Sequence, residues 1–492
     1  MSKTNEEGYG HILKYTGIFG GVQGLIILIG LVRNKVMALL LGAGGMGFNA
    51  LLVSVQNFAS QCTSLGISFG AVPRMSELYE QENRERLEHF IQTVRLWSMM
   101  SALLGFLFCI LISPLLNEAT FTWGNHTLHY SALGLSVAMM AISGGETAIL
   151  KATRRLGALA KIQIYVALFT VLVSIPLYYF FYHSGVLPVI VLTALTTMGA
   201  SIFYSYSFYP LKLSVNRQAM AEGMGMVKLG LAFVLAAAFG SAAEMLIRAF
   251  FNVEGGLDDV GLYNAGYMIT ITYAGMVFSA MESDYYPRLS AVQHDITATN
   301  ETVNRQMEVS LLLVSPMLAA LIIALPVVVP LLFSQAFLPV VGMAQVAALA
   351  MYMKVLTLPV AYITLARGYS LSYLFLETSY FVVFVVLIFF GYRYWGLFGT
   401  GIAITLAHVF EYLLVNGYAY KIYGYRSSAT VYGYAIVQVA LGLLAFVLTC
   451  TADGFLYWGT GILIVVLSAA LSWHVLHRKT HLWQALTRRF RR

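Results

Sequence analysis

Long apolar runs constrain this chain more than any other feature. A helix needs about 20 apolar residues to cross the hydrocarbon core of a bilayer. The chain has about fourteen such runs, near residues 14–41, 47–72, 92–114, 128–150, 158–182, 186–210, 225–250, 261–282, 306–333, 340–365, 370–391, 395–419, 430–451 and 455–476. Only 10% of its 492 residues are charged, against about 25% in soluble domains. We therefore predict an all-α polytopic membrane protein with about 14 transmembrane helices.

Lysine and arginine gather in every second connection between these runs. The basic groups are Lys3; Arg74, Arg84 and Arg86; Lys151, Arg154 and Arg155; Lys212 and Arg217; Arg288 and Arg305; Arg367; Lys421 and Arg426; and a tail from Arg478 to Arg492. The intervening connections contain neither residue type, with Arg393 as the one exception. Because basic loops remain in the cytoplasm, we expect an even number of spans and both termini in the cytoplasm.

An internal duplication divides the runs into two sets. Lys14, Gly47 and Pro73-Arg74 recur 214 residues later as Lys228, Gly261 and Pro287-Arg288. The copies are six spans apart, so they enter the membrane from the same side and form two pseudo-symmetric lobes, a common design of transporters. We predict an N-lobe over 1–217, a C-lobe over 218–424, a C-terminal helix pair over 425–478 and a basic cytoplasmic tail over 479–492.

Two segments outside the bilayer are amphipathic. Residues 74–92 mix acidic and basic side chains with Leu78, Leu87 and Ile91, and we expect a cytoplasmic surface helix there. The tail after residue 476 places Trp483 and Phe490 among basic residues, which suits either a helix on anionic headgroups or a solvated tail.

Several cations lie deep inside the apolar runs. Arg33 and Lys35 belong to the first run, Arg248 to the seventh and Lys354 to the tenth. A charge at membrane depth is unfavourable by several kcal/mol, and such residues usually line a pathway. Cations around one cavity would attract an anion, and phosphate or diphosphate suits Arg and Lys best. We therefore predict a substrate-binding role for these four residues.

Acidic and histidine residues form a second, smaller set. Glu146 lies at the inner end of the fourth run, Glu377 opens the eleventh, and His408 and Glu411 are three positions apart in the twelfth. We consider these four residues for ion coupling, because histidine titrates near neutral pH. Pairing near the interface and hydrogen bonds between helices are the competing explanations. Glu244 and Arg248, four positions apart, favour an internal ion pair.

Motifs for other chemistry are missing from the sequence. There is no Walker motif, HExxH, GxSxG or zinc-type Cys/His cluster, and the three cysteines are far apart within apolar runs. The glycine-rich stretch 42–47 joins two helices as a tight turn and follows no strand, so it is not a nucleotide loop. We expect no catalytic site, metal, cofactor or nucleic-acid partner, and a driving force from an ion gradient, the membrane potential or the substrate gradient.

The spacing Lys35-x2-Ala38-x3-Gly42-x2-Gly45-x-Gly47 resembles the opening of Wzx-type polysaccharide flippases. These belong to the multidrug/oligosaccharidyl-lipid/polysaccharide (MOP) exporter superfamily. In the second half, Arg248 with Val260-Gly261 and Pro287-x2-Ser290 is similar to the same family. Lys354, the Ala366-Arg367 turn and Glu377 add to the likeness. It covers nearly the whole chain in span order.

The resemblance implies alternating access by two six-helix lobes. The cargo would be an oligosaccharide linked to polyprenyl diphosphate, flipped from the cytoplasmic to the outer leaflet of the bacterial inner membrane for O-antigen or capsule. Arg33, Lys35, Arg248 and Lys354 would then receive the diphosphate and acidic sugars. The implied partners are this lipid-linked cargo, membrane lipids, a coupling ion (H⁺ or Na⁺) and other glycan-assembly membrane proteins. Spans 13 and 14 would form a groove for the lipid tail, as in related lipid II flippases.

Two other functions compete with this one. An ion-coupled drug antiporter of the same superfamily predicts deep acidic residues in the N-lobe, and the first run offers Arg33 and Lys35 with no Asp or Glu. A glycosyltransferase or polymerase acting on the same lipid carrier predicts a large extramembrane loop or paired catalytic carboxylates. Asp258-Asp259 is the only adjacent acidic pair of that kind on an expected outer loop.

Overall fold

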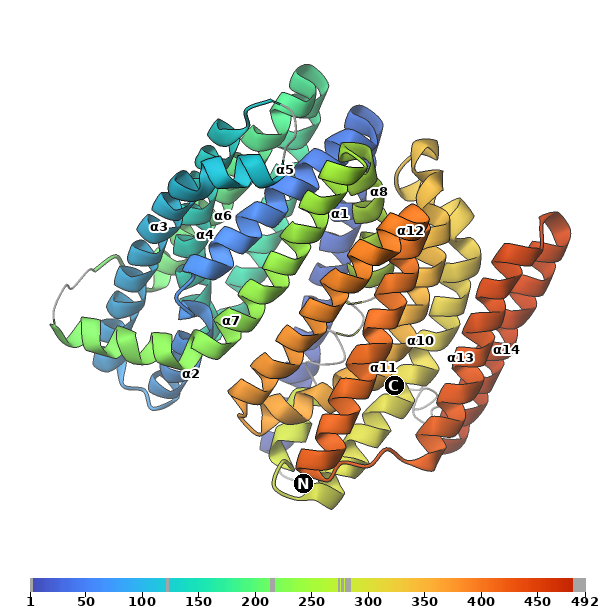
Figure 1. Ribbon diagram of the computed structural model, residues 1–492. Helices are drawn as coiled ribbons and strands as arrows, with labels where there is room; N and C mark the ends of the chain where they lie inside the picture. Colours follow the sequence, from blue (N-terminus) through green and yellow to red (C-terminus); the bar gives the residue numbers. More distant parts are fainter. Residues whose placement is uncertain are drawn as a thin grey trace. The chain divides into compact units, whose positions relative to one another are not determined.

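The computed structural model describes residues 3–120, 124–212, 217–272, 275, 278 and 285–480. Within these residues the chain forms helices and no strand, which confirms the all-α prediction. The helices are α1 (Lys3–Thr63), α2 (Ile67–Glu80), α3 (Arg84–Thr120), α4 (Thr127–Ala152), α5 (Leu156–Phe181), η1 (Tyr182–Gly185), α6 (Val186–Phe208), α7 (Arg217–Glu254), α8 (Leu257–Tyr267), η2 (Met268–Thr272), α10 (Ile296–Leu332), η3 (Gln335–Val340), α11 (Val341–Ala366), α12 (Ser370–Tyr418), η4 (Ala419–Tyr423), α13 (Ala429–Thr451) and α14 (Gly454–Thr480) (Figure 1).

Ten helical stretches of the described chain are long and apolar enough to cross a membrane. Three of them, Gly24–Thr63, Leu156–Phe208 and Ser370–Tyr423, each overlap two of the predicted spans. The predicted span 261–282 extends into residues outside the described ranges. The ten stretches therefore agree with the predicted layout of a multi-pass membrane protein.

A glycine lies at the break in each of the two longest helices. Gly42 has φ 67° and ψ −166° inside α1, and Gly396 has φ 58° and ψ −144° inside α12. A positive φ is accessible to glycine without a steric penalty, because glycine has no Cβ. The turn that the sequence predicts within the glycine-rich stretch 42–47 is thus made at its first residue.

The surface helix predicted over 74–92 is wrong. Helix α2 ends at Glu80 and α3 begins at Arg84, so the segment contains the ends of two helices and a turn between them. The side-chain oxygen of Asn83 accepts a hydrogen bond from the backbone N–H of Arg86 at 3.2 Å, which caps the first turn of α3. Glu82, with φ 54°, lies within the turn that ends the first helix.

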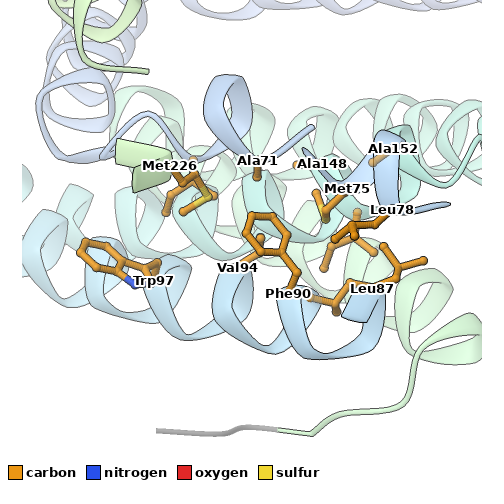
Figure 2. Close-up of a cluster of buried hydrophobic side chains, with 13 residues drawn as sticks. Ala71, Met75, Leu78, Leu87, Phe90, Val94, Trp97, Ala148, Ala152 and Met226 are labelled. Atoms are coloured by element: carbon orange, nitrogen blue, oxygen red, sulfur yellow. The ribbon is translucent and has the colours of Figure 1, made fainter. Parts of the chain in front are cut away.

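The apolar residues of these two helix ends face a common core. Figure 2 shows Met75 and Leu78 of α2 near Phe90 of α3 at one end of the cluster, and Trp97 of α3 near Met226 of α7 at the other. All five side chains are buried. The amphipathic pattern of the segment therefore marks two helices that close on each other.

Contacts divide the chain into two compact units. The first is Met1–Gly261 with Leu332–Ser334, and the second is Leu262–Leu331 with Gln335–Arg492. The lobe boundaries drawn from the sequence, at 217, 424 and 478, remain a proposal. The basic tail falls outside the described residues from position 481 onward.

In the first unit, the two sequence copies meet at matched glycines. A methyl group added at Gly47 would lie 1.9 Å from the carbonyl oxygen of Leu257, and one added at Gly261 would lie 1.9 Å from the carbonyl oxygen of Ala43. Leu257 and Gly261 are the residues 214 positions after Ala43 and Gly47. Helices α1 and α8 therefore make a backbone contact that is symmetric between the copies, in agreement with the predicted duplication.

In the second unit, α11 packs along α12, and α13 packs against α14. The buried side chain of Gln438 on α13 joins the last two helices. Its amide nitrogen donates to the hydroxyl of Ser472 at 2.9 Å, and its amide oxygen accepts from the hydroxyl of Ser468 at 2.6 Å. A polar group inside an apolar pair is tolerated when its hydrogen bonds are made within the pair.

Candidate functional site

In the first unit, Arg33 and Lys35 lie on α1 before the break at Gly42. Both side chains are half-buried. The Nε atom of Arg33 is buried and has no hydrogen-bond partner among the described residues. Arg33 is also close enough to the buried Tyr178 of α5 to interact with it electrostatically. A buried guanidinium nitrogen without a partner is unfavourable unless a ligand or water satisfies it.

Arg248 lies on α7 and is almost fully buried. Its Nη1 is 3.0 Å from Oε2 of Glu244 and donates to the Glu244 carbonyl oxygen at 3.2 Å. The internal ion pair that the sequence favours is therefore present. Glu244 has 41% of its side chain exposed, whereas Arg248 has 9%, so the positive charge is the more deeply buried partner.

In the second unit, Lys354 of α11 pairs with Glu411 of α12. The Nζ and Oε1 atoms are 2.9 Å apart. His408 lies one turn before Glu411, with Nε2 4.0 Å from Oε2 of that carboxylate. The Nδ1 atom of His408 is 2.9 Å from the carbonyl oxygen of Ile404. If Nδ1 donates to that carbonyl, Nε2 is left facing the carboxylate and can take up a proton there.

Glu377 and Tyr380, on the first half of α12, lie close to these residues. The ring of Tyr380 lies 5.9 Å from Nζ of Lys354 and 5.5 Å from the ring of His408. Glu377 is within electrostatic range of both Lys354 and Glu411. Two carboxylates thus share one lysine. We refer to Lys354, Glu377, Tyr380, His408 and Glu411 as the α11–α12 charge cluster.

Glu146 has a different environment from the other ion-coupling candidates. Arg95 of α3 donates hydrogen bonds to both carboxylate oxygens of Glu146, from Nε at 2.9 Å and from Nη2 at 3.2 Å. Arg95 also donates to the carbonyl oxygens of Tyr209 at 2.8 Å and Pro210 at 3.0 Å. Both charged side chains are nearly fully buried. The charge of Glu146 is therefore already balanced, and the pair holds the end of α6 to α3 and α4.

Arg95 is the residue that sequence reasoning missed. It lies within the predicted span 92–114, where it is as exceptional as Arg33 in its own run. It lies near the start of that span, and the sequence analysis assigned it no role. The sequence signal that identifies it is a second buried charge of opposite sign, Glu146, on the next span.

The structure thus brings together Lys354, Glu377, His408 and Glu411 in the second unit. In the first unit, Arg33 and Lys35 lie two positions apart on α1, and Arg248 lies on α7. Among the described residues, no group of three or more His, Cys, Asp or Glu side chains is arranged to hold a metal ion.

Comparisons with known proteins agree with this architecture. The model of the family described as "Polysaccharide biosynthesis protein" matches residues 36–342. No curated protein matches the chain.

Solved structures share the fold at low sequence identity. A multidrug resistance MATE family transporter of the MOP superfamily, in an inward-facing conformation, has a TM-score of 0.65 at 14% identity, covering 87% of this chain and 96% of that one. The lipid II flippase MurJ in an inward closed conformation has a TM-score of 0.66 at 13% identity, covering 94% and 98%. A MOP superfamily transporter from Pyrococcus furiosus, described as having a binding pocket of reverse polarity, has a TM-score of 0.50 at 13% identity, covering 83% and 94%.

At these identities the structural likeness establishes only that this chain shares the fold of these transporters. The family model matches well over half of the chain; it includes Arg248 and begins one residue after Lys35. This chain is a multi-pass membrane protein that belongs to the polysaccharide biosynthesis protein family.

Proposed function

We propose that this protein is an alternating-access flippase for oligosaccharides linked to polyprenyl diphosphate. It moves them from the cytoplasmic to the outer leaflet of a bacterial inner membrane, where they enter O-antigen, capsule or a similar polysaccharide. Both termini are cytoplasmic in this proposal, and the chain performs no covalent chemistry on its cargo. The family to which it belongs supports the polysaccharide, and the fold it shares with MurJ supports a lipid-linked form.

The observation that carries this proposal is the set of cations within membrane-spanning helices. Arg33, Lys35, Arg248 and Lys354 all lie inside stretches apolar enough to cross a bilayer. Charged residues at that depth are normally kept off lipid and face a polar path. A diphosphate is a strong acceptor for guanidinium and ammonium groups. The buried Nε of Arg33 is one such donor, and it has no hydrogen-bond acceptor among the described residues.

The α11–α12 charge cluster is the proposed place of ion coupling. Its two carboxylates, Glu377 and Glu411, are opposed by the single ammonium of Lys354. Uptake of one proton or Na⁺ would make the net charge of these three side chains zero, and release of that ion would restore a net negative charge. Interacting sites of this kind titrate as a unit. Glu146 contributes less to this proposal, because Arg95 already neutralises it.

A drug antiporter is the second candidate. The MATE transporter with the same fold supports it, as does the pair of carboxylates in the second unit. Against it, the buried acid of the first unit, Glu146, is engaged by Arg95. A cationic drug therefore has less to bind there than an anionic lipid does.

The test is the leaflet accessibility of lipid-linked oligosaccharide in cells with and without the protein. We expect the lipid-linked sugars to accumulate on the cytoplasmic face in its absence. Complementation with Arg33→Gln/Lys35→Gln should fail, while Arg393→Gln, a neutralised arginine at an exposed position, should restore export.

Full export by Arg33→Gln/Lys35→Gln would refute the role of these cations. An unchanged leaflet distribution in the absence of the protein would refute the cargo. In that case, efflux of cationic dyes by the same cells tests the antiporter.

A further inference from the structure

A separate cavity lies at the end of the first unit where α2, α3 and α7 come together. Its volume is about 450 Å³, and its lining includes Arg74, Arg86, His89 and Glu222. Volumes of this order accommodate small ligands. None of the cations of the proposed transport path lines it.

The floor of this cavity is apolar and firmly packed. Leu78, Phe90 and Met226 contribute to the lining, and all three belong to the buried cluster of Figure 2. Gly70 allows α2 to approach α7 closely, because a Cβ there would lie 2.2 Å from the carbonyl oxygen of Met226. The cavity is therefore enclosed by fixed helices on its inner side.

The polar side of the cavity is predominantly basic. Arg74 donates to Glu77 at 2.8 Å, and about half of each of these two side chains is exposed. Arg86 is exposed. The Nε2 atom of His89 is buried and has no hydrogen-bond partner within the described part of the chain. The polar lining thus contains two arginines and one histidine against one acidic residue, Glu222.

This combination suits a phosphate ester that carries hydroxyl groups. Arg74 and Arg86 provide charge-assisted donors for phosphate oxygens, and the imidazole of His89 adds a further hydrogen-bonding group. The carboxylate of Glu222 accepts hydrogen bonds from hydroxyl groups and discourages a bare, highly charged anion. The basic connections at this end of the helices mark it as the cytoplasmic side, where anionic lipid headgroups attract such residues.

We propose that this α2–α3–α7 cavity binds the phosphate ester of a hydroxylated headgroup, such as that of phosphatidylglycerol. The site is distinct from the transport path and does not depend on the cargo. A soluble glycerol or sugar phosphate presents the same chemistry, and the experiment separates the two sources.

The test uses the full chain purified in detergent and measures retained lipid by native mass spectrometry. Phosphatidylglycerol and phosphatidylcholine are titrated separately, and glycerol 3-phosphate is added as a competitor. We expect selective retention of phosphatidylglycerol. Arg86→Gln should weaken it about tenfold, a typical loss for one charge-assisted hydrogen bond.

A cavity-filling variant provides the second arm. Nothing lies within 4 Å of a Cβ built at Gly225, which lines the cavity, so Gly225→Trp should fill the space and abolish retention. Gly433→Trp on α13 is the matched control, since its Cβ also meets nothing within 4 Å. It should retain phosphatidylglycerol like the unaltered chain.

The outcomes separate clearly. Displacement of the lipid by millimolar glycerol 3-phosphate assigns the site to soluble phosphate esters, whereas resistance to it assigns the site to the lipid headgroup. Equal retention by the unaltered chain, Arg86→Gln and Gly225→Trp would overturn the proposal. Arg86→Gln keeps the test decisive if Gly225→Trp fails to fold, because Arg86 is exposed.

Discussion

Gly47 and Gly261 lie 214 residues apart in sequence and are in contact in space. A Cβ at Gly47 would lie 2.9 Å from the backbone nitrogen of Gly261. Each glycine also accommodates a carbonyl oxygen from the other copy of the repeat. The two copies of the repeat are therefore in contact at a point where neither α1 nor α8 has room for a side chain.

The first prediction concerns this contact. Gly47→Val or Gly261→Val should force α1 and α8 apart and lower the free energy of unfolding by about 1–3 kcal/mol, the usual result of overpacking. Thermal unfolding of the purified variants measures it. Gly24→Val is the control, because a Cβ at Gly24 meets nothing within 4 Å. Equal melting temperatures for Gly24→Val and Gly47→Val would contradict the described packing.

The second prediction separates charge from stability at Lys354. Lys354→Met leaves Glu411 as a buried charge without its main partner, so it should destabilise the protein by about 3–5 kcal/mol. Lys354→Met/Glu411→Gln should recover most of that stability and still fail to export glycan. Thermal unfolding and an export assay on the same variants provide the two readouts. Normal export by the double variant would remove Lys354 from the transport path.

The third prediction concerns Glu377. Glu377→Gln imitates a permanently protonated side chain, so the remaining carboxylate of the cluster has Lys354 to itself. We expect transport into proteoliposomes to lose much of its dependence on pH, with the fold retained. Glu301→Gln is the control, because Glu301 is exposed and paired with Arg305 on α10. An unchanged pH profile for Glu377→Gln would exclude this carboxylate from coupling.

The fourth prediction assigns Arg95 a structural role. Arg95→Ala removes the partner of the buried Glu146 and the hydrogen bonds to the carbonyl oxygens of Tyr209 and Pro210, just beyond the end of α6. We expect a loss of about 3–5 kcal/mol in stability and low expression. Arg95→Ala/Glu146→Ala should fold better than Arg95→Ala, and the protein that folds should transport. A stable but inactive Arg95→Ala protein would instead place Arg95 in the transport path.

The fifth prediction is a pH effect at the start of α4. Burial, together with the nearby His129, lowers the pKa of His126 below its ordinary value of 6.5. The folded state therefore binds protons less readily than the unfolded chain, and stability should fall as the pH drops below about 6.5. His126→Asn should flatten this decline, as measured by thermal unfolding between about pH 5 and 8. An identical decline in His126→Asn would exclude His126 as its source.

The sequence anticipated the helices well and the side-chain partnerships poorly. Apolar runs identify spans, because length and hydropathy alone decide what crosses a bilayer. The i,i+4 pair Glu244–Arg248 was also predictable, since helix geometry fixes its spacing. The Lys354–Glu411 pair, by contrast, joins residues 57 positions apart on different helices. No periodicity within one helix indicates which neighbour a buried charge will meet.

Residues 74–92 illustrate a second limit of prediction from the sequence, which concerns short turns. The charge pattern was compatible with one amphipathic helix. In the structure, a turn of three residues, Gln81 to Asn83, separates the segment into the ends of two helices. A turn of this size is decided by one residue at positive φ, Glu82, and glutamate has no strong preference for that conformation. The charge pattern therefore did not predict the turn between the two helices.

The polar bridge of Gln438 has a consequence for how the protein is made. Its amide finds its partners, Ser468 and Ser472, on the very next helix, so this buried amide needs no hydrogen-bond partner from the rest of the chain. We expect them to leave the ribosome and enter the bilayer as a finished hairpin. The remaining assembly step is then the docking of this hairpin, in which α13 packs against α11 and the Tyr457 hydroxyl of α14 donates to the Ile323 carbonyl oxygen of α10 at 2.8 Å.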